Sequence, residues 1–280
     1  MIILKFNIEL SFEIFPFKNN DLLKNFILFK KKILIYPYFI SITFGAIGKS
    51  ISDNINTIKF FIKKNINIVP HISCINLNLN NFKKNIYYYY INNIDKILIL
   101  KGDEINKKNN YYSYNLIKLI KYIFLNFFKI YIAIYCEFHN NSYNYKFDLK
   151  NSIIKLNLKI KYAITQYFYN IDSYFYFFDD IKKIKKSNYY IIPGVMPIFS
   201  IKQIIKFSNL CNTDLPVWIE KRINNYYFNN NDLKKISYDI IINLFFKLIK
   251  FKIKYIHIYT MNNIYYINNI LDKILLSNNL

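Results

Sequence analysis

A single carboxylate interrupts an apolar run near the start of the chain, where Glu13 is flanked by Phe12 and Ile14. Burying an ionised glutamate among such neighbours costs free energy unless the carboxylate is paired or the group is held neutral. A carboxyl group that stays partly protonated near neutral pH can act as a general acid. The alternative is a glutamate at a strand edge whose carboxylate reaches water, and residues 10–16 taken alone favour that alternative.

Two further polar residues follow apolar runs and could contact a polar heterocycle. Asp103 comes after Lys101 and Gly102 at the end of an aliphatic run, where a carboxylate could stabilise a developing cation. The other interpretation is a turn aspartate that bonds its own backbone. Gln166 stands among aromatic residues, and its amide can both donate and accept hydrogen bonds. It could equally be a buried glutamine satisfied by neighbouring backbone.

Ser200 begins a second candidate group. Ser200 and Gln203 match the S-x-x-Q capping box, which favours a structural role for Gln203 at a helix start. Gln203 and Phe207 are also four residues apart, so they present an amide and a ring on one helix face. The sequence therefore leaves two roles open for Gln203, a helix cap and a ligand contact.

Segment 147–160 has the spacing of an amphipathic helix, with an apolar stripe on one side. Its polar residues Asp148, Asn151 and Lys155 fall together on another face. That face could hold the ribose and phosphates of a dinucleotide. The alternative is an ordinary solvated face, which the segment by itself favours.

The histidines and cysteines form no recognisable metal site. His71, His139 and His257 are too dispersed to predict a metal centre or a catalytic dyad, and a hydrogen-bonded histidine at a strand end explains each one. The three cysteines are far apart and form no CxxC pair, so neither a zinc site nor a disulfide framework is predicted. The sequence has no GxGxxG, GxxxxGK[ST] or GxSxG motif, so a Rossmann turn is not expected.

Short apolar runs alternate with stretches of helical spacing along the whole chain. Strands are expected at 10–15, 39–44, 67–72, 97–101, 130–136, 162–168, 189–194 and 254–260, and helices at 113–125, 147–160, 172–183, 200–208 and 232–250. Asn-rich stretches are expected to be loops, at 76–81, 106–110 and 228–231. This alternation predicts an α/β fold, a single (β/α)₈ TIM barrel with its active site at the carboxyl ends of the strands.

The 280 residues carry a formal net charge of +22, which would ordinarily indicate a nucleic-acid or anionic-membrane partner. The lysines are spread through the chain and accompany many Asn, Ile, Tyr and Phe residues, all of which have A/T-rich codons. Genome composition therefore explains the charge, and a basic nucleic-acid-binding protein is the alternative from a different class. With no signal peptide, no spanning run and no cysteine framework, we expect a soluble cytoplasmic protein with no nucleic-acid or membrane partner.

Eight motifs, taken in order, resemble bacterial 5,10-methylenetetrahydrofolate reductase. They extend from about residue 9 to residue 275, and each lies at an expected strand end. The motifs are SFEIFP (11–16), FISITFGA (39–46), PHISC (70–74), LKGD (100–103), YCEFH (135–139), AITQYF (163–168), IIPGVMP (191–197) and HIYTMN (257–262). Any one fragment would be weak evidence, whereas eight in order are highly specific.

The resemblance implies a (β/α)₈ barrel that carries non-covalent FAD and holds no metal. NADH or NADPH would reduce the flavin and leave, and 5,10-methylenetetrahydrofolate would replace it in the same cleft. The product would be 5-methyltetrahydrofolate, the methyl donor for methionine synthesis. Residues 1–280 would form one catalytic domain without the S-adenosylmethionine-binding regulatory domain of animal homologues. A folate substrate and a homo-oligomeric assembly are expected on the same ground.

The resemblance also implies a role for individual residues. Glu13 matches the general acid that helps to open the folate ring to a 5-iminium cation, and Asp103 matches the aspartate that stabilises this cation. Thr43 and Gln166 would meet the nicotinamide nucleotide. The matched folate contacts are Asp103, Gln166, Gln203 and Phe207. The matched FAD contacts are Thr43, Phe44, Ala46, His71, Lys101, Gly102, Asp103, Ser113, Tyr135, His139, Ser142, Asp148, Asn151 and Lys155.

The chain departs from the family pattern at several positions. Lys101 stands where the family usually has Arg, which keeps the charge but gives up bidentate geometry, and Phe44 replaces a Tyr. Ile154 stands where an Arg usually assists the FAD phosphates, and Asn263 where an Arg usually meets the folate. The last two changes favour a third interpretation, a decayed reductase with weak activity, whereas the retained acid and amide residues oppose it.

Overall fold

The structure, a computed structural model, describes residues 8–17, 24, 36–44, 51–74, 77, 79–101, 112–185, 188–225 and 230–276. Eight parallel strands form a closed barrel in chain order, and β8 pairs with β1. The predicted (β/α)₈ barrel is therefore confirmed, and every strand begins and ends within about two residues of its predicted span. The strands are β1 (Glu9–Ile14), β2 (Phe39–Ile42), β3 (Ile68–Ser73), β4 (Lys96–Leu100), β5 (Lys129–Ile134), β6 (Tyr162–Tyr167), β7 (Tyr190–Val195) and β8 (Tyr255–Tyr259).

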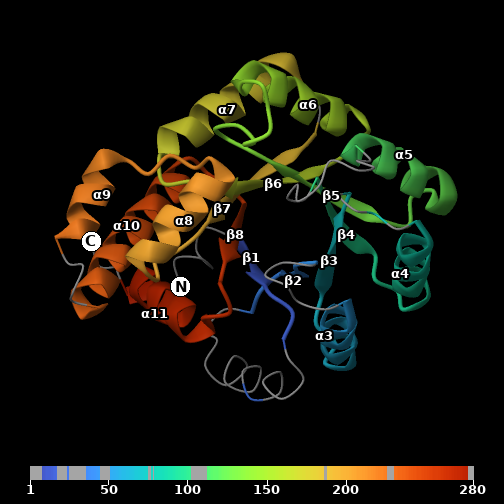
Figure 1. The fold of residues 1–280 in the computed structure, drawn as a ribbon, viewed down its shortest axis with the longest axis horizontal. Helices are drawn as coiled ribbons and strands as arrows, with labels where there is room; N and C mark the ends of the chain where they lie inside the picture. Colours follow the sequence, from blue (N-terminus) through green and yellow to red (C-terminus); the bar gives the residue numbers. More distant parts are fainter. Residues whose placement is uncertain are drawn as a thin grey trace.

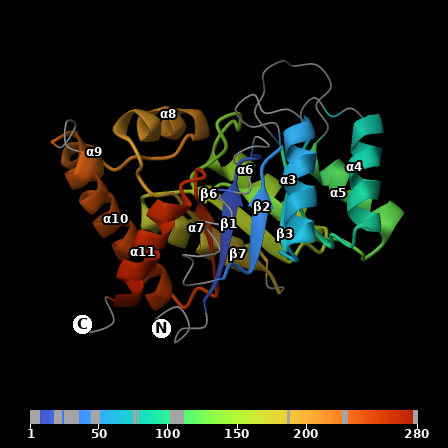
Figure 2. The same cartoon turned by 90° about the horizontal axis from the view of Figure 1, so that it is seen from below.

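Helices surround the strands, as Figure 1 shows. They are α3 (Ile51–Lys63), α4 (Leu79–Ile91), α5 (Ser113–Phe124), α6 (Tyr145–Asn157), α7 (Ile171–Ile184), α8 (Ile201–Cys211), α9 (Val217–Asn224), α10 (Asn230–Lys250) and α11 (Ile264–Leu276). In Figure 2, α3 and α4 run alongside the strands, whereas α8 crosses beyond the end of the barrel. Among the described residues, no helix is long and apolar enough to cross a membrane.

The predicted helices are present as α5, α6, α7, α8 and α10, while the sequence reasoning missed α3, α4, α9 and α11. Two loop predictions are wrong in part, because α4 begins at Leu79 and α10 at Asn230, and residues 106–110 lie outside the described residues. In α4, the buried residues Phe82, Ile86 and Tyr89 have helical spacing. Asn80 and Asn81, from the segment that suggested a loop, are exposed on this helix, so they do not disturb its packing.

The barrel interior is apolar toward the amino end of the strands and polar toward the carboxyl end. Side chains alternate between the inside and the outside of a barrel along each strand. An interior cluster is formed by Phe39, Val69, Leu98, Tyr131, Ile164, Ile192 and Tyr255. Ser41, His71 and His257 come two residues further along three of these strands and are buried on the same interior face. A layer of polar groups therefore follows the apolar interior cluster toward the carboxyl ends of the strands.

Gly194 allows a tyrosine ring to cross this polar layer. A Cβ atom at Gly194 would lie 2.4 Å from the carbonyl oxygen of Thr165 and 2.6 Å from Cε2 of Tyr259. The Tyr259 hydroxyl donates to that carbonyl at 2.8 Å, and the N–H of Gly194 donates to the Thr165 hydroxyl at 2.8 Å. The contact joins β6, β7 and β8, so a larger residue than glycine does not fit there.

Candidate active site

Glu13 lies inside the barrel near the end of β1, between histidines from β3 and β8. Its Oε2 atom is 3.6 Å from Nε2 of His71 and 3.8 Å from Nε2 of His257. The Glu13 side chain is 16% exposed, and the two histidines are 5% and 0% exposed. The carboxyl group is therefore largely enclosed beside two imidazole rings rather than at an open strand edge.

His71 is a neutral member of this cluster. Burial lowers the pKa of His71 to about 4, an effect that Glu13 opposes and His257 reinforces. Its ring therefore carries no charge at neutral pH, and each ring nitrogen can donate or accept according to the tautomer. The Glu13 carboxyl group thus has a neutral imidazole as its neighbour from β3.

His257 is held by serines from two strands. Its Nδ1 lies 2.8 Å from the hydroxyl of Ser11 on β1, and its Nε2 lies 3.5 Å from the hydroxyl of Ser41 on β2. The strand register explains the arrangement, because Ser11 is paired with His257 and Glu13 is paired with Ser41. Closure of the barrel between β8 and β1 therefore fixes this ring below Glu13.

His71 and His257 are far apart in the chain, yet both lie beside Glu13. Spacing along the chain says nothing about which strands a closed barrel brings together, so the sequence reasoning missed His257, Ser11 and Ser41. One signal was available, since alternation along a strand puts Ser11 on the same side as Glu13.

The polar face predicted for segment 147–160 is turned toward the barrel at two of its three positions. The N–H of His139 donates to Oδ2 of Asp148 at 3.1 Å, and Asp148 is 9% exposed. Nζ of Lys155 donates to the carbonyl oxygen of Ala133 on β5 at 2.8 Å. Burial lowers the pKa of Lys155, against the opposing effect of Asp148. A solvated face is therefore excluded for Asp148 and Lys155, while Asn151 is partly buried.

Three of the predicted contact residues have buried polar atoms that await a partner. Within the described part of the chain, the Thr43 hydroxyl, Nε2 of His71 and the Ser142 hydroxyl are buried and form no hydrogen bond. Buried polar atoms in native proteins are nearly always hydrogen-bonded. These three residues come from the ends of β2 and β3 and the loop after β5, and their unpaired atoms fit a polar ligand on the carboxyl side of the barrel.

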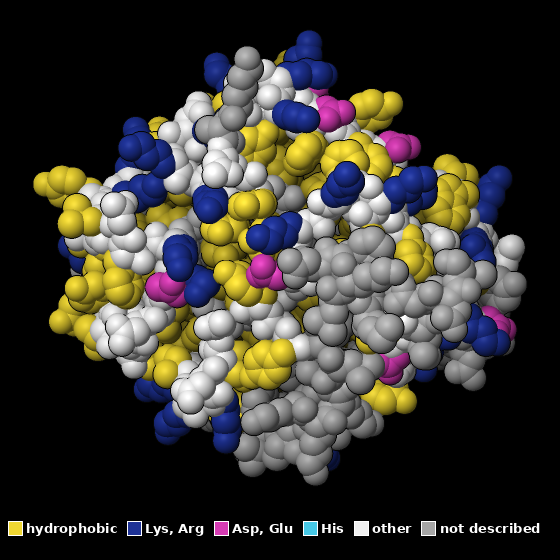
Figure 3. All heavy atoms as spheres, turned by 180° about the vertical axis from the view of Figure 1, so that it is seen from behind, with side chains coloured by type: hydrophobic (Ala, Val, Ile, Leu, Met, Phe, Trp, Pro, Cys, Tyr) yellow, Lys and Arg dark blue, Asp and Glu magenta, His cyan; other side chains and the backbone are white. Residues whose placement is uncertain are grey.

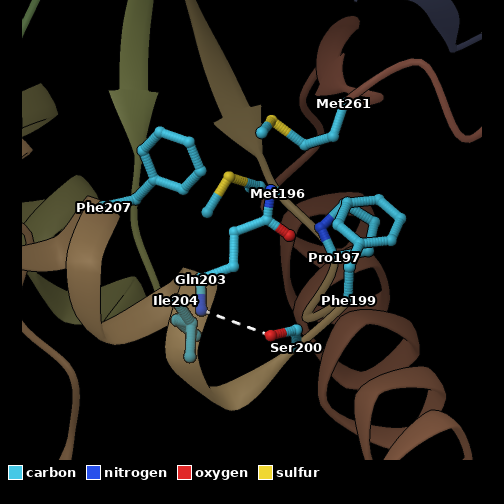
Figure 4. A pocket seen from close by; sticks show the side chains of 8 residues that line it. All are labelled: Met196, Pro197, Phe199, Ser200, Gln203, Ile204, Phe207 and Met261. Carbon is cyan, nitrogen blue, oxygen red and sulfur yellow. Dashed lines mark hydrogen bonds between the residues drawn. The ribbon is translucent and has the colours of Figure 1, made fainter.

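A shallow hollow lies where α8 crosses the barrel end. Figure 4 shows the Gln203 amide and the Phe207 ring directed into this hollow, with Met196 between them and Met261 above. The N–H of Gln203 donates to the Ser200 hydroxyl at 3.3 Å, which confirms the helix cap. The cap uses the Gln203 backbone, so the two roles that the sequence left open for this residue are compatible.

Gln166 lines a second shallow hollow, together with Glu137 and Tyr135 from the end of β5. The Gln166 side-chain oxygen accepts the N–H of Tyr167 at 3.0 Å, which leaves its amino group free of that bond. Oε2 of Glu137 accepts the N–H of Asp214 at 2.9 Å. Burial raises the pKa of Glu137 to about 7, although the Asp214 N–H opposes this.

The structure gives fewer contacts for the remaining residues that were predicted to bind the cofactor. The ring of Tyr135 meets that of His139 edge-on at a centroid distance of 4.7 Å, at the same strand end. Phe44 is the second residue after β2, Ser113 is the first residue of α5, and Lys101 directly follows β4, where its carbonyl accepts the Ser73 hydroxyl at 3.4 Å. Three predicted residues lie outside the described residues, namely Ala46, Gly102 and Asp103.

Comparison with known proteins shows the family to which the chain belongs. The sequence profile of methylenetetrahydrofolate reductase matches residues 2–275. The chain is 34% identical over 259 residues to the 5,10-methylenetetrahydrofolate reductase of Buchnera aphidicola subsp. Schizaphis graminum, a match that covers 91% of this chain and 88% of that relative. The chain belongs to the methylenetetrahydrofolate reductase family. It is therefore an oxidoreductase, and the resemblance of its eight motifs is confirmed.

More distant relatives agree with this assignment. The enzyme of the same name from Escherichia coli is 28% identical over 262 residues, which cover 91% of this chain and 86% of that relative. A solved structure of an uncharacterized protein from Clostridium thermocellum, described as binding two copies of 5-methyl-5,6,7,8-tetrahydrofolic acid, superposes with a TM-score of 0.67. That match covers 96% of this chain and 97% of the other at 14% identity, and at this distance it supports the barrel fold alone.

Proposed function

We propose that the chain reduces 5,10-methylenetetrahydrofolate to 5-methyltetrahydrofolate with non-covalent FAD and with NADH or NADPH as the electron donor. The reaction would be ping-pong and would supply methyl groups for methionine synthesis. The observation that carries the proposal is that three expected flavin contacts have buried polar atoms without partners among the described residues, and that one of them, His71, lies beside the enclosed Glu13. The names of the relatives support folate as the substrate. A homo-oligomeric assembly is part of the proposal and rests on the family resemblance alone.

The residues around the carboxyl ends of β2, β3 and β5 fit FAD. When bound, FAD would accept and deliver the hydride. Hydrogen bonds from the flavin dinucleotide to Thr43, His71 and Ser142 would satisfy three buried atoms that have no partner among the described residues. Lys155 would provide a cation for the phosphates, since its ammonium group is already turned inward beside Asp148. Thr43 would also meet the nicotinamide nucleotide, together with Gln166.

Glu13 is the proposed general acid of the folate step. His71 is neutral near pH 7, and His257 is held by the hydroxyls of two serines. Glu13 is thus the acidic group of this cluster, and it would give a proton to a folate nitrogen as the five-membered ring opens. Enclosure within the barrel would keep bulk water from competing for that proton.

The folate is proposed to lie against α8 and the end of β6. Gln203 and Phe207 already face one hollow, and Gln166 lines the next one. An amide beside a ring suits a pterin, which offers donors and acceptors at its edge and an aromatic face. Asp103 remains a predicted contact and predicted cation stabiliser on the strength of the motif alone.

The structure offers an explanation for two departures from the family pattern, at Asn263 and Ile154. Oδ1 of Asn263 accepts the N–H of Tyr266 at 3.2 Å, so the asparagine caps α11 in place of the family's arginine. Ile154 is 40% exposed on α6, whereas Lys155 next to it is turned toward the barrel. We therefore propose an active enzyme rather than a decayed one, with Lys155 as the cation that α6 provides for the phosphates.

The alternative of a nucleic-acid-binding protein has less support. Figure 3 shows Lys and Arg side chains distributed over one face of the molecule and separated by apolar and uncharged side chains. A protein that tracks a phosphate backbone concentrates its cations along a groove or stripe. The cations that Figure 3 shows on the described part of this face form no such stripe, as expected if composition explains the charge.

The flavin spectrum of the purified protein tests the proposed function. The protein should be yellow, or become yellow on addition of FAD, and NADH or NADPH should bleach its absorbance without oxygen. Addition of 5,10-methylenetetrahydrofolate should then restore the absorbance. A colourless protein that FAD cannot reconstitute would contradict the proposal, and so would a reduced flavin that the folate fails to reoxidise.

A further inference from the structure

The end of β1 that carries Glu13 is tied to the turn after β8. The Thr260 hydroxyl donates to the carbonyl oxygen of Glu13 at 2.6 Å, and the Thr260 N–H reaches the same oxygen at 3.2 Å. Thr260 is completely buried. The backbone of the proposed general acid is thus held by two hydrogen bonds from one residue of a neighbouring strand.

Asn262 holds the next part of the same segment. Its Oδ1 accepts the N–H of Phe15 at 2.8 Å, and its Nδ2 donates to the carbonyl oxygen of Phe15 at 3.1 Å. One side-chain amide therefore pairs with both polar groups of the Phe15 backbone, as a neighbouring strand would. The N–H of Asn262 also donates to the Thr260 hydroxyl at 3.1 Å, which joins the two sets of bonds.

The turn that contains Met261 and Asn262 has an uncommon backbone conformation. Met261 and Asn262 have φ angles of 49° and 59°, in the left-handed region. Asparagine tolerates this conformation, whereas methionine adopts it at a cost in free energy. Such a conformation persists only where surrounding contacts hold it, and the bonds to Glu13 and Phe15 are contacts of that kind.

Ordinary sheet pairing includes Glu13 and Ile14, which pair with Ser41 and Ile42 of β2, but it does not extend over Phe15. β1 ends at Ile14, and the following Pro16 has no N–H to donate. The next anchor along the described chain is the N–H of Phe17, which donates to the Thr57 hydroxyl at 3.0 Å. Thr260 and Asn262 therefore add to the strand pairing of Glu13 and hold the backbone just beyond it, and displacements of about 1 Å can decide a proton transfer.

We propose that Thr260 and Asn262 are positioning residues that hold the Glu13 carboxyl group in place for its proton transfer. They act through the backbone of Glu13 and Phe15 and contact neither the flavin nor the folate in this account. The inference rests on the proposed function of Glu13, but the clamp itself is a property of the folded chain that can be measured without turnover.

Four variants test the clamp. Asn262→Leu removes both bonds to Phe15, and Thr260→Val removes the hydroxyl bond to Glu13, whereas Thr260→Ser keeps it. The control is Asn170→Ala, which removes a helix cap at α7, where Asn170 accepts the N–H of Asp172 at 3.1 Å. This control lowers stability by loss of a comparable bond far from β1.

Two readouts separate positioning from general stability. Residue-resolved amide exchange should show the Phe15 N–H exchanging at least about tenfold faster in Asn262→Leu and unchanged in Asn170→Ala. Anaerobic single-turnover kinetics should show the folate half-reaction slowed by about tenfold or more in Asn262→Leu and Thr260→Val, with flavin reduction by NADH nearly unchanged. The pH profile of the folate half-reaction should shift in these two variants, and Thr260→Ser should behave like the wild type.

Several results would overturn the inference. Unchanged Phe15 exchange in Asn262→Leu would show that there is no clamp, whatever the activity. Equal losses in both half-reactions, or a Thr260→Ser variant as impaired as Thr260→Val, would show a merely structural role. If the wild-type protein failed to reduce folate at all, the proposed function would fail, and the exchange data would still decide whether the clamp exists.

Discussion

Nε2 of His71 lies 3.6 Å from Oε2 of Glu13, yet burial keeps this imidazole neutral in spite of the neighbouring carboxyl group. If His71 were protonated and paired with an ionised Glu13, the proton would reside on the imidazole and Glu13 could not donate it to the substrate. A neutral ring beside the carboxyl group forms no ion pair with it and does not take its place as the acid. The site therefore combines one acidic group with two enclosed imidazoles.

The low pKa of His71 predicts a pH dependence of stability. Between pH 4 and the ordinary pKa of 6.5, the unfolded chain binds a proton at His71 that the native state does not bind. The free energy of unfolding should thus decrease as the pH falls through this window, by up to about 3 kcal/mol. His71→Gln should flatten this part of the curve. Denaturant titrations of both proteins at several pH values test this, and parallel curves would contradict it.

The raised pKa of Glu137 predicts a pH dependence of stability with the opposite sign. Burial raises the pKa of Glu137 to about 7 from an ordinary value of 4.5, so the native state binds a proton in that window that the unfolded chain has released. Stability should therefore fall as the pH rises from 4.5 to 7, by up to about 3 kcal/mol. Glu137→Gln keeps an oxygen for the Asp214 N–H and should be more stable than the wild type above pH 7. Equal stabilities at pH 8 would rule out this contribution.

Lys155 should contribute to flavin affinity. Lys155→Met removes the inward ammonium group with little change in shape, and loss of a charge-assisted bond should weaken FAD binding by about tenfold to a hundredfold. Lys150→Met on the exposed side of the same helix is the matched control and should bind FAD like the wild type. Titration of the apoprotein with FAD gives both dissociation constants. Equal affinities in the two variants would remove Lys155 from the proposed phosphate site.

Gly194 should tolerate no side chain. In Gly194→Ala the new methyl group would meet the Thr165 carbonyl and the Tyr259 ring at distances far below van der Waals contact. The backbone oxygen cannot move away without breaking strand pairing, so we expect a loss of about 2–3 kcal/mol in unfolding free energy. Denaturant unfolding measures this loss. A variant within about 0.5 kcal/mol of the wild type would show that the barrel relaxes easily at this point.

The sequence was sufficient to predict the strands, because near-continuous runs of Ile, Leu and aromatic residues are typical of strands buried on both faces. It was less informative for α4, where asparagines resemble a loop until Phe82, Ile86 and Tyr89 are seen to share the buried side. Asparagine is common throughout this chain, so its usual value as a loop signal is reduced.

The sequence predicted the site residues that lie within motifs, but not the contacts between residues of different strands. The acid Glu13 and the amides Gln166 and Gln203 stand at strand and helix ends that the periodicity locates. Two contacts depend on the pairing of the last strand with the first. They are the proximity of His257 to Glu13 and the hydrogen bonds between the Asn262 side chain and the Phe15 backbone. Contacts of that kind come from barrel closure, and no local pattern in the sequence specifies them.

The central claim is that Glu13 donates a proton in the folate half-reaction and has no part in the reduction of the flavin. Anaerobic stopped-flow measurement of both half-reactions in Glu13→Gln tests it most directly. Reduction of the flavin by NADH should stay within about threefold of the wild-type rate, while reoxidation by 5,10-methylenetetrahydrofolate should slow by at least about a hundredfold. Equal losses in the two half-reactions would contradict the claim and make Glu13 a structural residue.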